Sequence, residues 1–128
     1  MRALLDTHAF LWFVRDDKRL SQRARELIED SDSELLLSAA SAWEIIINVG
    51  TGKLKLQSEV ETFLKEQLAL NFIEPLPIRL EHVLAISRLP SHHRDPFDRL
   101  IIAQGITEGL PIVSNDAEFT RYRVRLIW

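Results

Sequence analysis

The chain has 128 residues, and its 16 basic and 19 acidic side chains give a formal net charge of −3. This length suits one domain that buries roughly two thirds of the surface of its unfolded chain, so we expect a single domain over residues 1–128. The charge excludes a strongly cationic, non-specific coat for nucleic acid, although basic residues can still cluster locally. The absence of cysteine excludes a disulfide framework and a thiolate nucleophile or zinc site.

The first apolar run, Ala3-Leu4-Leu5, is interrupted by Asp6 and is far too short for a signal peptide or a membrane span. Together with the absence of cysteine, this predicts a soluble protein of the reducing cytoplasm, with no membrane partner.

Short apolar runs alternate with stretches of helical periodicity along the chain. In order, they predict a strand, two helices, a strand, two helices, a strand, two helices, a strand, a helical turn and a strand. These elements lie at residues 2–5, 9–14, 20–28, 34–37, 38–49, 58–70, 72–74, 80–89, 95–106, 111–114, 116–120 and 124–127. Glycine and proline mark several boundaries, such as Gly50 after the third helix and Pro90 after the fifth. The alternation indicates an α/β fold with a parallel sheet.

Four acidic residues each lie where a predicted strand has just ended or a predicted helix begins: Asp6, Glu44, Asp98 and Asp116. If the strands are parallel neighbours, their ends meet at one edge of the sheet, where open α/β sheets bind ligands. Two carboxylates about 4 Å apart repel by roughly 1 kcal/mol at the dielectric of water and by roughly 4 kcal/mol at an effective value near 20. Mg²⁺ or Mn²⁺ would remove that repulsion, because hard divalent ions prefer oxygen ligands.

Each of these acids also has a structural interpretation. Ser41 and Glu44 have the S-x-x-E spacing of a capping box. Asp95 followed by Pro96 is an N-cap and N1 pair, which makes Asp98 an N3 residue favoured by the helix dipole. The other two acids, Asp6 and Asp116, are of a type common in turns and N-caps. A cap and a ligand are compatible roles, because a capping acid is held rigidly.

Four motifs carry these acids: Leu5-Asp6-Thr7-His8, Ser41-Ala42-Trp43-Glu44-Ile45, His93-Arg94-Asp95-Pro96-Phe97-Asp98-Arg99-Leu100 and Val113-Ser114-Asn115-Asp116-Ala117-Glu118-Phe119. In their order and spacing they closely resemble those of PIN-domain ribonucleases, specifically the VapC-like toxins of bacterial toxin–antitoxin pairs. The resemblance covers essentially the whole chain. It implies a three-layer α/β/α sandwich with a central parallel sheet.

The resemblance also implies an activity, which is the Mg²⁺- or Mn²⁺-dependent endoribonuclease hydrolysis of RNA phosphodiester bonds. The implied catalytic residues and metal ligands are Asp6, Glu44, Asp98 and Asp116. Asp98 is preferred over Asp95 because it shows the family's D-x-x-I-x-A spacing, here with Ile101 and Ala103. Asp95 is then expected to act as a cap or to support the ligands.

Further residues are candidates for supporting the ligands or contacting the substrate: Thr7, Asp95, Arg99, Ser114, His93 and Arg94. His92, Lys53 and Lys55 are weaker candidates for phosphate contacts, since a solvated basic loop explains them equally well. The adjacent His92 and His93 would not face one ion easily. The three tryptophans are expected in the core or at an interface rather than stacked on bases. Gly105 lies inside a predicted helix, which costs about 1 kcal/mol of helix propensity.

As a toxin, the protein is expected to bind RNA as substrate, a small cognate antitoxin, and a second copy of itself through apolar helix faces. The antitoxin is expected to place a basic or aromatic segment into the acidic pocket. Two alternatives stay open from the sequence. One is a DNA- or structure-specific nuclease outside a toxin–antitoxin system, and the other is a catalytically silent PIN-like binding protein.

Overall fold

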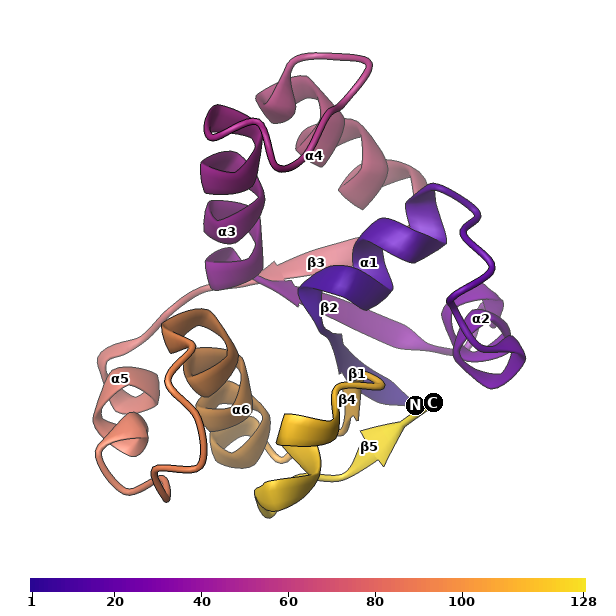
Figure 1. Ribbon diagram of the computed structural model, residues 1–128. Helices are drawn as coiled ribbons and strands as arrows, with labels where there is room; N and C mark the ends of the chain where they lie inside the picture. The colour runs from indigo at the N-terminus through magenta and orange to yellow at the C-terminus, as the bar shows by residue number, and fades with distance from the viewer.

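The computed structural model describes residues 1–128 and is built around one five-stranded sheet (Figure 1). Its strands are β1 (Arg2–Leu5), β2 (Glu34–Ser38), β3 (Ile73–Leu76), β4 (Ile112–Val113) and β5 (Leu126–Ile127). They lie in the order β3-β2-β1-β4-β5, and every pairing between neighbours is parallel. The predicted parallel α/β sheet is therefore confirmed, with β1 at its centre.

Six helices and one short 3₁₀ helix connect the strands. They are α1 (Thr7–Val14), α2 (Gln22–Glu29), α3 (Ala39–Gly50), α4 (Val60–Leu70), α5 (Leu80–Ile86), α6 (Pro96–Glu108) and the 3₁₀ helix η1 (Ala117–Arg121). None of the helices has both the length and the apolar character that a membrane crossing requires.

Alternate side chains of the central strands enter two separate cores. Ala3 and Leu5 of β1 belong to a buried cluster with residues of α1, α2, α3 and α4, whereas Leu4, between them, belongs to a second cluster with residues of α6 and η1. This follows from the two-residue side-chain period of a strand. Helices on both faces of the sheet form the three-layer sandwich that the resemblance implied, with α1 and α6 on opposite sides (Figure 1).

Side chains at the element ends explain where the predicted boundaries were wrong. α1 starts two residues earlier than predicted because Asp6 caps it, with the Ala9 N–H donating to Asp6 Oδ1 at 2.6 Å. The N-cap of α3 is Ser38, which accepts from the Ala40 N–H at 3.0 Å. The capping box proposed for Ser41 is therefore wrong, because Ser41 already lies inside the helix.

Differences at β3 and α5 also have local causes. Phe72 has a positive φ of 53° and so ends the turn before β3 instead of belonging to the strand. β3 extends through Pro75, which is possible because β3 lies at an edge of the sheet, where one side of the strand needs no donors. α5 ends at Ile86, three residues before the predicted end, because residues 87–89 continue as turns.

Gly105 lets α6 approach the sheet closely. A Cβ atom at this position would lie 2.9 Å from Ile112 Cδ1 and 3.0 Å from Ile112 Cγ1, and Ile112 of β4 is fully buried. The missing side chain therefore has a packing role that offsets its cost in helix propensity. Gly50, at the end of α3, has no neighbour within 4 Å of such a Cβ atom.

These two glycines predict opposite effects of the same substitution. Gly105→Ala gains about 1 kcal/mol of helix propensity but overpacks the core at a cost of roughly 1–3 kcal/mol, so we expect a net loss of about 1 kcal/mol in the free energy of unfolding. Gly50→Ala, the matched control, is expected to gain a few tenths of a kcal/mol. Urea unfolding measures both, and equal stabilisation by both alanines would contradict the packing role.

Candidate active site

The four predicted acids meet at the carboxyl-terminal edge of the sheet. Asp6 follows β1, Glu44 lies in the second turn of α3 after β2, Asp98 lies in the first turn of α6, and Asp116 follows β4. In Figure 1 the first turns of α1, α3 and α6 and the start of η1 surround this edge. Parallel strands bring these segments together although 110 positions separate the first acid from the last.

Asp6 is the most deeply placed of the four, with a residue exposure of 6%. Burial raises the pKa of its carboxyl, and the nearby charge of Asp116 raises it further. Hydrogen bonds from the Ser114 hydroxyl and the Ala9 N–H act in the opposite direction, as does the charge of His8. Its cap position therefore fixes the carboxylate at the edge of the site.

Glu44 is held by a pair of hydroxyl groups. Thr7 Oγ1 lies 2.7 Å from Glu44 Oε1 and 2.9 Å from Ser41 Oγ. Because a hydroxyl has one proton, Thr7 donates it to the carboxylate and accepts the Ser41 proton. Partial burial raises the pKa of Glu44 and the charges of Asp95 and Asp6 add to this, whereas the Thr7 hydrogen bond and the charge of His8 lower it.

Asp98 has a strongly perturbed carboxyl group. Burial raises its pKa from 3.8 to about 8, and the negative charges of Asp95, Asp116, Glu44 and Asp6 contribute in that order. Its backbone N–H donates to the cap residue Asp95 at 3.2 Å, which confirms its N3 position. Because every other acid of the cluster acts on Asp98, the four carboxyl groups share one electrostatic environment.

Asp116 and Ser114 complete the cluster from the segment after β4. Asp116 caps η1 by accepting from the Glu118 N–H at 2.9 Å. The buried Ser114 hydroxyl accepts from the Asp116 N–H at 3.1 Å and is hydrogen-bonded to the carboxyl of Asp6. Ser114 therefore joins two of the acids, which come from neighbouring strands.

The four acids share this edge of the sheet, but no three of them have ligand atoms that all lie within 4.8 Å of one another. The one trio of potential ligand residues whose ligand atoms all lie within 4.8 Å of one another is found elsewhere, at Glu81, His82 and Glu108. Carboxylates that share a sheet edge repel one another, and a divalent cation among them would offset that repulsion. Oxygen donors of this kind suit a hard divalent ion.

Comparison with known proteins supports the assignment of the fold. A family model described as PIN domain matches residues 3–124. The chain belongs to the PIN-domain family. Ribonuclease VapC22 of Mycobacterium tuberculosis is 32% identical to it over 121 residues, which are 94% of this chain and 91% of that protein.

Solved structures share the PIN fold at lower identity. VapBC2 from Rickettsia felis, described as bound to a DNA fragment from its promoter, aligns with a TM-score of 0.72 and 17% identity over 99% of this chain and 98% of that one. FitAcB from Neisseria gonorrhoeae aligns with a TM-score of 0.67 and 20% identity over 100% of this chain and 97% of that one. VapBC-5 from Mycobacterium tuberculosis aligns with a TM-score of 0.62 and 19% identity over 98% of this chain and 97% of that one.

The other residues predicted to support the ligands or contact the substrate have different surroundings in the PIN domain. Asp95 Oδ1 accepts from the Phe97 and Asp98 N–H groups, so Asp95 serves as the cap of α6. His93 is mostly buried, and its Nε2 lies 3.5 Å from Asp98 Oδ2. The Arg99 guanidinium donates to the carbonyl oxygens of Pro90 and Ile86, so it is bound within the protein. Arg94 is exposed beside the cluster.

Sequence reasoning missed two features at this edge of the PIN domain. The charge of His8 acts on both Asp6 and Glu44, and its ring lies 5.6 Å from that of Trp12. Trp43 is 57% exposed and packs edge-to-face on Phe97 at 5.1 Å. Trp43 directly precedes Glu44, and Phe97 directly precedes Asp98. The available signal was their position inside the same motifs.

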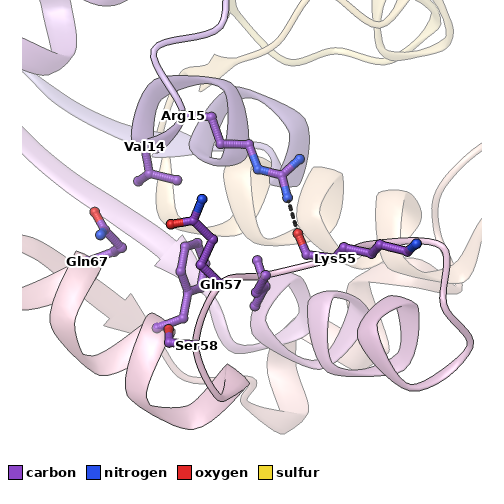
Figure 2. A pocket seen from close by; sticks show the side chains of 8 residues that line it. Val14, Arg15, Lys55, Gln57, Ser58 and Gln67 are labelled. Atoms are coloured by element: carbon purple, nitrogen blue, oxygen red, sulfur yellow. Dashed lines mark hydrogen bonds between the residues drawn. The ribbon is translucent and has the colours of Figure 1, made fainter.

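Lys55 lies far from the acids, at a cavity of about 660 Å³ between the end of α1, residues 55–58 and α4 (Figure 2). Arg15 Nη2 donates to the Lys55 carbonyl oxygen at 2.8 Å, whereas the Lys55 side chain extends away along the loop. The cavity adjoins the opposite end of α1 from Asp6, about 12 Å away at 1.5 Å per helical residue. Lys53, in the preceding turn, is exposed.

The trio of Glu81, His82 and Glu108 has a structural explanation. His82 is fully buried; its Nδ1 accepts from the Arg79 N–H at 3.0 Å, and its Nε2 lies 2.8 Å from Glu108 Oε1. Both ring nitrogens are therefore used to cap α5 and to fasten it to α6. No lone pair of the ring is left for an ion.

The raised pKa of Asp98 predicts how stability depends on pH. Without divalent ions, the folded protein binds more protons than the unfolded chain between the unfolded pKa near 4 and the folded value of about 8, so the free energy of unfolding falls as pH rises through this range. Asp6 and Glu44 contribute with the same sign. We expect the melting temperature in a chelating buffer to fall between about pH 5 and about pH 8, and Asp98→Asn to reduce this slope.

Asp17 offers a matched control for this measurement. Hydrogen bonds from Arg19 lower the pKa of its carboxyl to about 2, so its contribution is lost only as pH falls below the unfolded value. Asp17→Asn should therefore leave the slope above about pH 5 unchanged. A slope that is the same in the parent and in Asp98→Asn would show that Asp98 does not titrate in this range.

Proposed function

We propose that this protein is a Mg²⁺- or Mn²⁺-dependent endoribonuclease that hydrolyses RNA phosphodiester bonds as the toxin of a toxin–antitoxin pair. The observation that carries the proposal is the clustering of four carboxyl groups from distant segments of the chain. The charges of the other three, Asp116, Glu44 and Asp6, all raise the pKa of Asp98. The 32% identity to a protein named Ribonuclease VapC22 supports the activity. The names of the structural neighbours, VapBC2 and VapBC-5, support the toxin role.

In this proposal Asp6, Asp98 and Asp116 hold the divalent ion. Asp6 and Asp116 are N-caps whose carboxyl groups accept backbone N–H groups, and Asp98 is an N3 residue in the first turn of α6. The ion supplies Lewis acidity toward the phosphate and lowers the pKa of a bound water. Binding requires Asp98 to lose its proton, because carboxyl ligands coordinate as anions.

Glu44 has a different role, which is to position the attacking water. Its Oε1 accepts the Thr7 proton, and the second oxygen stays available for a water molecule. The water oxygen attacks phosphorus, and the water proton passes to a carboxylate or to solvent. The bond from phosphorus to the leaving oxygen breaks with its electron pair on that oxygen, which takes a proton from solvent. The raised pKa of Glu44 makes it a better proton acceptor than an ordinary carboxylate.

Removing single charges from the cluster tests this assignment. Asp6→Asn and Asp98→Asn should abolish cleavage of single-stranded RNA in Mg²⁺ or Mn²⁺. Folding should be nearly unaffected, because asparagine can also cap α1 at position 6 and has nearly the shape of aspartate at position 98. Asp95→Asn, which keeps the cap of α6, is the control and should retain most of the activity. Cleavage is followed on labelled RNA, with matched DNA and folded RNA as competing substrate classes. Parent-level cleavage by Asp6→Asn would refute the assignment.

We further propose an antitoxin partner, homodimerisation and a cytoplasmic location. An antitoxin segment that is basic would complement the acidic cluster, and an aromatic one would meet the Trp43–Phe97 pair. For the homodimer, exposed apolar side chains follow helical spacing on two helices that both contact α6: Trp43, Ile46 and Ile47 on α3, and Leu80, Val83 and Leu84 on α5. Such faces are costly to leave in water.

The toxin role has its own test. Induction of the parent chain in a bacterial host should stop growth, and co-expression of the small reading frame next to its gene should restore it. Asp98→Asn, which lacks the proposed activity, should not slow growth at an equal protein level measured by immunoblot. Growth at the control rate after induction of the parent would contradict toxicity while leaving the nuclease assignment to the cleavage assay.

A further inference from the structure

A continuous line of polar contacts connects Arg99 with Asp98 through two other side chains. Arg99 Nη1 donates to Tyr122 Oη at 3.3 Å, Tyr122 Oη lies 2.8 Å from His93 Nδ1, and His93 Nε2 lies 3.5 Å from Asp98 Oδ2. The contacts bring together residues of α6, the segment after η1 and the loop before α6. None of them follows from the spacing of the motifs.

The number of protons on each group decides which one donates in each of these hydrogen bonds. Arginine has only donors, so Tyr122 Oη accepts from Arg99 and keeps its own proton for His93 Nδ1. A neutral imidazole that accepts at Nδ1 carries its proton on Nε2. The N–H of His93 therefore faces the carboxyl group of Asp98.

This N–H is a buried donor with no hydrogen-bond partner. Its distance of 3.5 Å to Asp98 Oδ2 is slightly beyond the usual range of about 2.7–3.2 Å for such bonds. A small rotation of the Asp98 side chain would close the gap, and an ionised carboxylate would gain a charge-assisted bond by doing so. Buried donors without a partner are rare. The N–H of His93 is therefore placed to donate to Oδ2 of an ionised Asp98.

The supporting groups are rigid. Arg99 is bonded to the carbonyl oxygens of Pro90 and Ile86 in addition to Tyr122, and Tyr122 is 6% exposed. The His93 ring packs against Tyr122 and Phe119, with centroid distances of 5.5 and 6.5 Å. Burial also keeps His93 and Tyr122 from binding a phosphate of the substrate directly.

We propose that Tyr122 and His93 are positioning residues for Asp98, which hold its Oδ2 through His93 Nε2–H and leave Oδ1 free for the divalent ion. This inference rests on the proposed function, in which Asp98 is a metal ligand. Residues that hold a ligand through a hydrogen bond commonly change metal affinity by about 10–100-fold when mutated.

The test measures metal affinity directly. Tyr122→Phe keeps the packed ring and removes only the hydroxyl, so it should weaken Mn²⁺ binding by about 10-fold in calorimetry on the antitoxin-free protein. RNA cleavage should recover toward the parent rate at saturating Mn²⁺. Arg123→Gln changes a charged neighbour that makes none of these contacts and should bind Mn²⁺ like the parent. His93→Gln, which keeps a side-chain N–H, should lose less affinity than His93→Ala.

The proton position on His93 and the Mn²⁺ affinity of the parent distinguish failure of the positioning role from failure of the proposed function. Nitrogen NMR of the Mg²⁺-loaded parent should show the proton of His93 on Nε2, and a proton on Nδ1 would overturn the inference. Parent-level Mn²⁺ affinity in Tyr122→Phe would also overturn it, while the proposed function would stand. A parent that binds no Mn²⁺ would refute the metal site itself, and the positioning role with it.

Discussion

Repulsion among carboxyl groups at the carboxyl-terminal edge of the sheet is the constraint on which the rest of this structure depends. The parallel strands and short connections bring Asp6 and Asp116 to the ends of neighbouring strands, the second turn of α3 adds Glu44, and the first turn of α6 adds Asp98. The parallel register of β1 and β4 places the segments that carry Asp6 and Asp116 beside each other. The raised pKa of Asp98 reduces the repulsion, because a protonated carboxyl adds no charge to the cluster.

The backbone supplies part of the compensation. Asp6 and Asp116 accept hydrogen bonds from the first N–H groups of the elements that follow them, and Asp98 lies in the first turn of α6. Helix N-termini favour negative charge, so each cap lowers the cost of an acid that would otherwise destabilise the fold. The structural and functional interpretations of these acids are therefore one arrangement, in which a cap orients the carboxylate that the proposed ion requires.

The rest of the site is built from contacts between distant side chains. Thr7 of α1 holds Glu44 of α3, and Ser114 joins Asp6 to the segment that carries Asp116. At Gly105 the helix α6, which carries Asp98 in its first turn, packs closely against Ile112 of β4. Local departures from propensity thus occur where packing around the site needs them.

The sequence by itself determined the order of the elements, the parallel α/β fold and the four acids, because side-chain periodicity and helix-start chemistry are local properties. It did not determine the N-cap of α3: the S-x-x-E spacing at Ser41 was available, but Ser38 lies at the strand end and starts the helix first. Nor did it determine the contacts of Arg99 or the ring orientation of His93. Those depend on Tyr122, more than 20 positions away, which only the folded chain places beside them.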